Sequence, residues 1–455
     1  MHAENSRAAA WQRPGGGRKW HRLAGQVYTV CHVINLYGSL GFLIKGTLGG
    51  VFPEAESTTK GGIYGGSPFL LTLWLYWLTG ALSLGMGIFH IVRGEVQRHR
   101  SWMSINYGTT FGAGGLRMGW MVLSMLTGET MDRTNMLSVY ILITVFLSIL
   151  PCLYTSFAHR KLFQPAADKT QDAPCTWTAL GWLVLELAAV VTSAAVVNQS
   201  VSRFPGLVGP AWASTPDLNT VLGGSNVTLT EEAASYAQAA YRAADPSTFA
   251  PAALLHAGSW SVALVGGPIL LRRATQDPET LSVGAPLMAT YLVAVVGILI
   301  STACTPLNEQ LSLGSMLLSR PSATEGHFYR GLGAGAWNMK MLALAVKTGI
   351  FAATAATGDK TRAVEWALHS YGEVATYMLL LPATWLFQRV LPTYEDAFHH
   401  GFLVGGVGMP LIFYIVGIYV FASEVDRNIS AKKRGLFASW RGIKLSRASF
   451  KAKGE

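Results

Sequence analysis

Two histidines in the first two apolar segments are the residues whose spacing best fits a redox cofactor. A b-type haem in a helix bundle needs two neutral imidazoles at similar depth on different helices. His32 lies seven residues from one end of segment 25–49, and His90 lies three residues from the matching end of segment 67–93. At 1.5 Å per residue their depths differ by about 6 Å. Basic groups for the propionates stand at the same end, namely Arg93, Arg98 and Arg100. The sequence thus raises haem b as one hypothesis, and two histidines that hydrogen-bond carbonyls or water as its alternative.

A second set of residues points to the movement of ions or protons. Five ionisable residues stand inside apolar segments: Arg117, Glu186, Lys340, Lys347 and Glu373. A charge at the centre of a bilayer costs about 3 kcal/mol on insertion scales, so each must face protein or water. Depth along the segments predicts that Arg117 pairs with Glu186 near the midplane, and that Lys347 pairs with Glu373 slightly inward. Such pairs fit an ion- or proton-coupled transporter, and they equally fit charges that only hold helices together.

No catalytic or metal-binding pattern accompanies these residues. The four cysteines form no CxxC pair and no zinc spacing, so disulfide and metal readings have little support. No nucleotide-binding loop and no catalytic triad is present in the sequence. We therefore name no catalytic residue and no metal ligand, and whether the protein is an enzyme stays open, with the balance against it.

The elements that must position these residues are membrane helices. The chain has 455 residues, of which 50% are hydrophobic and 13% charged, whereas soluble domains carry about 25% charged residues. A membrane-spanning helix takes about 20 apolar residues, and ten segments reach that length. The sequence predicts an all-α, polytopic transmembrane helix bundle. The ten expected spans are 25–49, 67–93, 101–126, 134–158, 175–197, 249–272, 283–304, 331–356, 364–388 and 400–423.

The charge distribution predicts an orientation. Residues 1–24 hold five Lys or Arg against one acid, and residues 424–455 hold nine against three. Positive flanks stay on the inner side of a membrane, and ten spans return both termini to one side, so both are expected on the inner side. The same charges indicate anionic lipids as partners rather than nucleic acid. The C-terminal tail mixes basic and apolar residues, as in a helix that lies on an anionic leaflet or docks on another subunit.

The chain is expected to divide into a basic tail at 1–24, a four-helix unit at 25–158, a linker at 159–174, a six-helix unit at 175–423 and an amphipathic tail at 424–455. A long outer loop is expected at 198–248. Glycosylation sequons begin at Asn198 and Asn226 on the outer side. Segment 101–126 carries two small-xxx-small pairs, Gly108/Gly112 and Gly115/Gly119, which let another helix approach closely.

Two motifs near the N-terminus carry a resemblance to a known family. The first is His99-Arg100-x-Trp102-Met103, followed by a helix that ends in Leu116-Arg117. The second is His21-Arg22-x-x-Gly25-x-x-Tyr28 at the entry to the first helix. Together they resemble a family of predicted bacterial membrane proteins of unknown function, over about residues 20–126. The resemblance implies a membrane-helical architecture for this part of the chain and implies no reaction.

These observations favour a non-enzymatic accessory or scaffold subunit of a larger membrane complex, with other membrane subunits as partners. A single-haem redox protein that uses His32 and His90, and an ion- or proton-coupled transporter, are the alternatives. The mitochondrial inner membrane and the plasma membrane are the two candidate locations.

Overall fold

The computed structural model describes residues 16–48, 66–127, 138–158, 179–203, 246–282, 284–304, 327–387, 389–390 and 394–417. These residues form helices and the turns between them, and no strand occurs among them. The all-α prediction is therefore confirmed for this part of the chain. Six of the described helices are long and apolar enough to cross a membrane, which makes the chain a multi-pass, membrane-embedded protein.

The chain folds as two compact units, residues 1–114 and 115–455. The division falls inside helix α4 (Val96–Thr127). The expected linker at 159–174 and most of the expected outer loop at 198–248 lie outside the described residues, as do the tail at 424–455 and the sequon at Asn226. The domain division expected from the sequence therefore stays a prediction.

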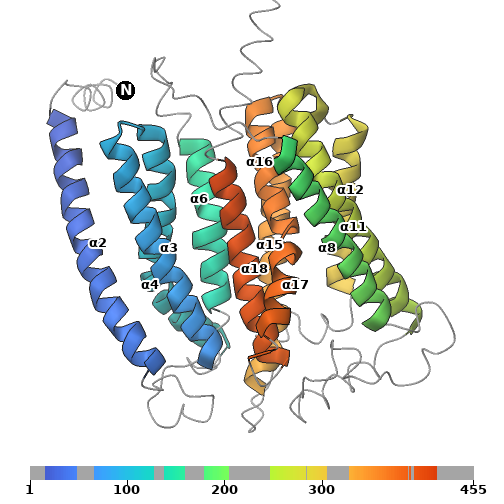
Figure 1. The fold of residues 1–455 in the computed structure, drawn as a ribbon, viewed down its shortest axis with the longest axis horizontal. Coiled ribbons are helices and arrows are strands. Elements are labelled where there is room, and N and C mark those ends of the chain that lie inside the picture. The colour runs from blue at the N-terminus through green and yellow to red at the C-terminus, as the bar shows by residue number, and fades with distance from the viewer. Residues whose placement is uncertain are drawn as a thin grey trace, which may run out of the picture. The chain divides into compact units, whose positions relative to one another are not determined.

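Unit one contains helices α2 (Gly16–Leu48) and α3 (Gly66–Val92) and the first part of α4. Helix α2 begins well before the expected start at residue 25 and so takes in part of the expected tail. A tight turn joins α3 to α4, and Gly94 adopts a φ of 77° there, a left-handed conformation that favours glycine. The turn brings the start of α4 back along α3 (Figure 1).

Unit two contains the rest of α4 and the helices from residue 138 onward. The segment after α4 consists of three consecutive helical pieces: the π-helix η2 (Ile143–Ile149), α6 (Leu150–Leu153) and the π-helix η3 (Tyr154–Ala158). Helices α8 (Ala179–Arg203), α11 (Pro246–Gln276) and α12 (Pro286–Cys304) pack side by side, with the short η6 (Pro278–Leu281) between the last two. Helices α15 (His327–Ala356), α16 (Lys360–Val374), α17 (Tyr377–Phe387) and α18 (Tyr394–Val416) complete the unit (Figure 1).

One expected span is broken into two helices. The sequence predicts one helix over 364–388, whereas α16 ends at Val374 and α17 begins at Tyr377. The regular i→i−4 bonding continues to Ala375, whose N–H donates to the Tyr371 carbonyl at 2.7 Å, but the next N–H, of Thr376, reaches Glu373 O at 3.4 Å instead. The N–H groups of Met378 and Leu379 also donate to the carbonyl three residues earlier. The backbone therefore tightens over the short stretch that joins α16 to α17.

Glycines on α18 allow α17 to lie against it. A Cβ added at Gly405 would lie 2.6 Å from the Leu380 backbone nitrogen, and one added at Gly401 would lie 2.8 Å from that of Thr384. Backbone atoms cannot swing aside as a side chain can. These two positions, four residues apart, therefore act as a small-xxx-small pair, one that the sequence reading did not single out.

Candidate functional site

Three charged side chains meet in the interior of unit two. Lys340 and Lys347 are seven residues apart and so lie on one face of α15, opposite Glu373 in the last turn of α16. Lys347 Nζ lies 2.5 Å from Glu373 Oε1, and Lys340 Nζ is paired with Glu373 Oε2. The three residues are 4%, 1% and 1% exposed in that order (Lys340, Lys347, Glu373). The structure thus brings Lys347 and Glu373 together, as their depths suggested, and adds Lys340 to the same carboxylate.

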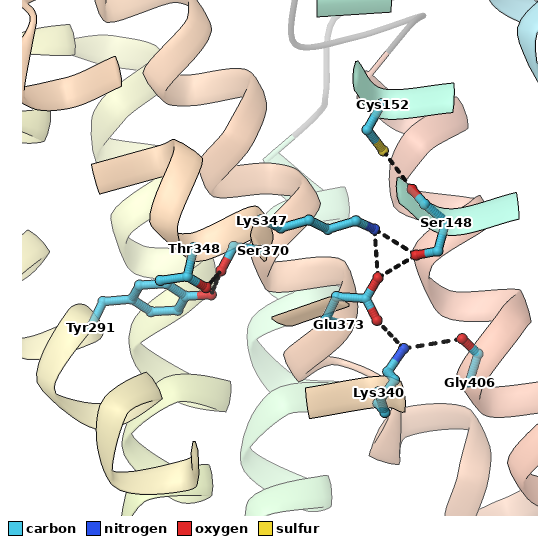
Figure 2. A network of polar contacts seen from close by, with 9 residues as sticks. All are labelled: Ser148, Cys152, Tyr291, Lys340, Lys347, Thr348, Ser370, Glu373 and Gly406. Carbon is cyan, nitrogen blue, oxygen red and sulfur yellow. Dashed lines mark hydrogen bonds and ion pairs between the residues drawn. The ribbon is translucent and has the colours of Figure 1, made fainter. Parts of the chain in front are cut away.

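A serine on the π-helix completes one half of this site. Ser148 Oγ accepts a hydrogen bond from Lys347 Nζ at 2.7 Å and donates one to Glu373 Oε1 at 2.5 Å. Figure 2 shows the three groups in one triangle, with the Cys152 thiol donating to the Ser148 carbonyl at 3.1 Å. The hydroxyl therefore links the ammonium group to the carboxylate and fixes their geometry.

A proline completes the other half. Lys340 Nζ donates to the Gly406 carbonyl of α18 at 3.0 Å. In a regular helix that carbonyl would accept from the N–H four residues later, but Pro410 stands there and has no N–H. The carbonyl left without its helical partner is the one that binds the lysine (Figure 2).

The site holds one more basic group than acidic group. When both lysines are ionised, the pocket around Glu373 carries one net positive charge, whereas one neutral amine leaves it neutral. Burial disfavours the net charge, so the two lysines compete for one carboxylate. A small cavity, lined by Lys340, Thr144 and Gly406 among others, has room for about one water molecule beside them. The arrangement can bind and release a proton without exposing an unpaired carboxylate.

A second polar cluster lies next to the site in Figure 2. Thr348 Oγ1 and Ser370 Oγ are 2.7 Å apart, and Tyr291 OH lies 3.0 Å from the same serine. These three buried hydroxyl groups satisfy one another. They tie α12 to α15 and α16 on the side of the site away from Ser148.

The expected pair of Arg117 and Glu186 is not formed. Glu186 Oε1 instead accepts from Arg272 Nη1 of α11 at 3.2 Å, in a pair that is partly exposed. Arg117 is itself exposed among the described residues. The prediction of a buried pair was wrong, because depth along a helix does not give its rotation, and rotation turns Glu186 toward α11.

The proposed haem ligand His32 sits in a hydrogen-bonded cluster within unit one. Its Nε2 lies 3.3 Å from Asn106 Nδ2 and its Nδ1 lies 3.3 Å from Thr110 Oγ1. Tyr28 stacks on the imidazole and donates to Asn106 Oδ1 at 2.6 Å. An iron atom would have to displace one of these contacts, so the geometry fits a hydrogen-bonded core histidine better than an open ligand.

The other proposed haem residues stand around the turn between α3 and α4. His90 Nδ1 lies 2.6 Å from Glu95 Oε2, which also accepts from Arg98 Nη1 at 3.0 Å. Arg93 lies over the Phe89 ring at 4.8 Å, and Arg100 is half-buried. Glu95, which the sequence analysis did not consider, thus binds both His90 and Arg98 and stabilises the turn.

The His-Arg-x-Trp-Met motif also packs at this hairpin. The backbone oxygen of Gly87 lies 2.8 Å from His99 Nδ1, while Trp102 is buried and a Cβ at Gly87 would lie 2.8 Å from Met103 Sδ. The motif residues therefore join the start of α4 to the end of α3. Their contacts explain an architectural role and point to no reaction.

The predicted packing glycines of α4 serve different neighbours. Within unit one, a Cβ at Gly112 would lie 2.6 Å from the Tyr76 ring, and Gly108 is buried. Within unit two, a Cβ at Gly115 would lie 3.1 Å from Phe146 and one at Gly119 would lie 3.4 Å from Ser138. Of these glycines, Gly112 and Gly115 have the closest neighbours, and in both cases the neighbour is an aromatic ring.

Among the described residues, no group of three or more His, Cys, Asp or Glu could hold a metal ion. The site residues that sequence reasoning missed are Ser148 and the carbonyl of Gly406. Only the second had a signal, since Pro410 follows it by four residues in an apolar segment. A hydroxyl in an apolar segment is too common to single out.

Comparison with known proteins adds no further constraint: no family model, no curated protein and no solved structure matches this chain.

Proposed function

We propose that this protein transports protons across a membrane, and that Lys340, Glu373 and Lys347 form its proton-binding site. The observation that carries the proposal is one buried carboxylate shared by two buried lysines. A purely structural ion pair needs one base for each acid. The surplus lysine gives the pocket a proton that it can lose while Glu373 keeps a charged partner.

The two lysines provide two positions for that proton. With Lys347 charged and Lys340 neutral, the charge lies beside Ser148. With Lys340 charged and Lys347 neutral, it lies beside the Gly406 carbonyl. Glu373 stabilises both states, because its two oxygens contact one lysine each. The extra proton can therefore be held by either lysine of α15, and in both positions it stays next to the Glu373 carboxylate.

The backbone around the site supports movement of this kind. Ser148 lies in a π-helical stretch, Glu373 precedes the break between α16 and α17, and Gly406 precedes a proline in mid-helix. Single-turn π-helical segments often occur at functional sites, and interrupted helices form the substrate sites of many transporters. Three irregular helices converge on one charged centre.

The proposed topology has ten spans with both termini on the inner side. Besides the six candidate spans, α12 and α18 contain shorter apolar helical stretches, and α4 and the α16–α17 pair coincide with the two remaining expected segments. In this topology the turn at 357–359 is on the inner side, so Lys347 is the inner lysine of the site and Lys340 the outer one.

Proton flux into liposomes that enclose a pH-sensitive dye tests the proposal. The membrane potential is set with potassium and valinomycin, and Lys347→Met is the informative variant because it leaves a neutral Lys340–Glu373 pair. We expect the variant to fold and to lose about tenfold or more of the flux, the scale of positioned acid–base groups. Glu186→Gln is the matched control, since it removes a carboxylate from the partly exposed pair with Arg272.

A flux by Lys347→Met equal to that of the wild-type protein would contradict the proposal. The site would then be a structural ion cluster, and the accessory-subunit hypothesis would account for it better. Co-migration of the protein with a large complex in mild detergent would support that second hypothesis.

A further inference from the structure

We infer that a buried imidazole, His369, connects the proton-binding site to the inner surface, where Glu365 exchanges protons with the solution. This inference rests on the proposed function and adds the path by which the site exchanges protons on one side. Glu365, His369 and Glu373 are spaced four residues apart on α16 and so follow one face of the helix. They cover about 12 Å of its length at 1.5 Å per residue.

His369 is buried, and hydrogen bonds of standard geometry do not fix its ring nitrogens. It is 3% exposed, and neither ring nitrogen has a hydrogen-bond partner of standard geometry among the described residues. Its ring stacks on Tyr414 of α18 at 5.7 Å and meets Trp366 edge-on at 5.5 Å. An imidazole used only for packing would be expected to have its nitrogens satisfied. A nitrogen without a fixed partner can accept a proton and pass one on.

The inner side of the ring faces a carboxylate. His369 Nε2 lies 3.9 Å from Glu365 Oε1, and the Glu365 side chain is 22% exposed. This separation exceeds a hydrogen bond, so transfer takes place through one water molecule or after a shift of the partly exposed side chain. Glu365 stands in the second turn of α16, after the turn that the proposed topology places on the inner side.

The other end of the route reaches the site through Cys152. The Cys152 thiol donates to the carbonyl of Ser148 at 3.1 Å, and the hydroxyl of the same serine accepts from Lys347. Cys152 is also the titratable group of α6 whose electrostatic influence reaches both His369 and Lys347. The titratable groups that interact with His369 are thus Glu365 on its own helix, Cys152 on α6 and Tyr414 on α18. From Lys347 the chain of contacts continues to Glu373 and Lys340.

The transfer conserves protons at every step. Glu365, protonated from the inner solution, gives its proton to the neutral His369 ring at Nε2 and becomes a carboxylate again. The imidazolium gives its Nδ1 proton to the Cys152 sulfur, whose own S–H proton turns from the Ser148 carbonyl and passes to the neutral amine of Lys347. The ring is left protonated at Nε2 and returns to its Nδ1–H form before the next proton enters. No oxidant or reductant takes part, and the reverse order releases a proton to the inner side.

The test measures proton flux in liposomes for His369→Gln and Glu365→Gln. We expect each to reduce flux by about tenfold or more, with wild-type thermal stability for the partly exposed Glu365 variant. Glu365→Asp, which keeps the carboxylate, should restore most of the flux, a recovery that a packing role would not produce. His256→Gln is the matched control, because His256 is a histidine of unit two that contacts Ser301 and Tyr377 away from this route.

The outcomes separate the two proposals. Wild-type flux in both Glu365→Gln and His369→Gln, together with a loss in Lys347→Met, would overturn this route and leave the proposed function intact. Absence of flux in the wild-type protein would overturn both. If His369→Gln does not fold, the pair Glu365→Gln and Glu365→Asp decides, since equal flux in the two would also overturn the route.

Discussion

At the residue scale, the arrangement around Glu373 follows from the cost of burying charge. A carboxylate inside a helix bundle needs cationic partners, and a lysine without a carboxylate nearby is costly. Ser148 and the Gly406 carbonyl each accept one further hydrogen bond, from Lys347 and Lys340 respectively. The charges of the centre therefore depend on one another, and removal of single members should have very unequal effects.

The first prediction concerns the unequal effects on stability. Glu373→Ala leaves two buried ammonium groups without an acid and should destabilise the protein by about 3–5 kcal/mol. Lys347→Met leaves a neutral pair and should cost much less. Thermal unfolding in detergent, followed by circular dichroism at the helical band, measures both. Equal losses in the two variants would show that the lysines do not share one carboxylate.

The second prediction concerns the turn between α3 and α4. Burial raises the pKa of Glu95, but the hydrogen bonds and charges of His90 and Arg98 outweigh it and hold the pKa below its usual 4.5. A carboxyl group whose pKa is lower in the folded than in the unfolded chain stabilises the fold at any pH above the unfolded-chain pKa. This contribution disappears as the pH falls through the folded-state pKa. The melting temperature of the wild-type protein should therefore fall more steeply below about pH 4.5 than that of Glu95→Gln. Parallel curves for the two proteins would refute this.

Sequence reasoning reached the residues of the site unevenly, for physical reasons. Lys347 and Glu373 could be paired because both lie deep in apolar segments, where a charge without a partner is costly. The same logic gave Arg117 a partner in Glu186, although Arg117 is exposed and Glu186 binds Arg272. Depth follows from residue number, whereas rotation about a helix axis depends on packing that a single sequence does not state.

At the element scale, irregular helices build the site. A regular helix keeps every backbone carbonyl in its own ladder, so it has none to offer a lysine. Pro410 frees the Gly406 carbonyl, and Pro151 similarly removes the N–H that would reach the carbonyl of Leu147 at the end of η2. Both prolines are visible in the sequence. The break after Glu373 has no proline at that point, which is why one continuous helix was expected there.

The third prediction concerns the contact between α17 and α18. Gly405→Ala would place a methyl group against the Leu380 backbone and should destabilise the protein by about 1–3 kcal/mol through overpacking. Gly349→Ala is the control, because no atom lies within 4 Å of the added group on α15. That change should be neutral or stabilise by about 0.5–1 kcal/mol, as alanine favours a helix over glycine. Thermal unfolding of the two variants side by side measures the difference.

At the scale of the whole molecule, the helical class follows from composition together with the length of the apolar segments. With half of the residues hydrophobic and few charged, a chain of this length can satisfy its backbone in a bilayer only as helices or as a closed barrel. Each expected span overlaps described helical residues, and six helices are long and apolar enough to cross a membrane. The division of the chain into units was less accessible, because it depends on which helix faces meet.

The last prediction concerns the sides of the membrane. Both tails carry an excess of basic residues, and such flanks favour the inner side, so we expect an even number of spans between them. Single cysteines placed at Ser6 and Ser449, in a variant with Cys31, Cys152, Cys175 and Cys304 replaced, would report this through a membrane-impermeant maleimide. We expect both to be protected in right-side-out vesicles and both to react after permeabilisation. Reaction of only one in sealed vesicles would require an odd number of spans, and would reverse the side assigned to Glu365 or to the turn between α3 and α4.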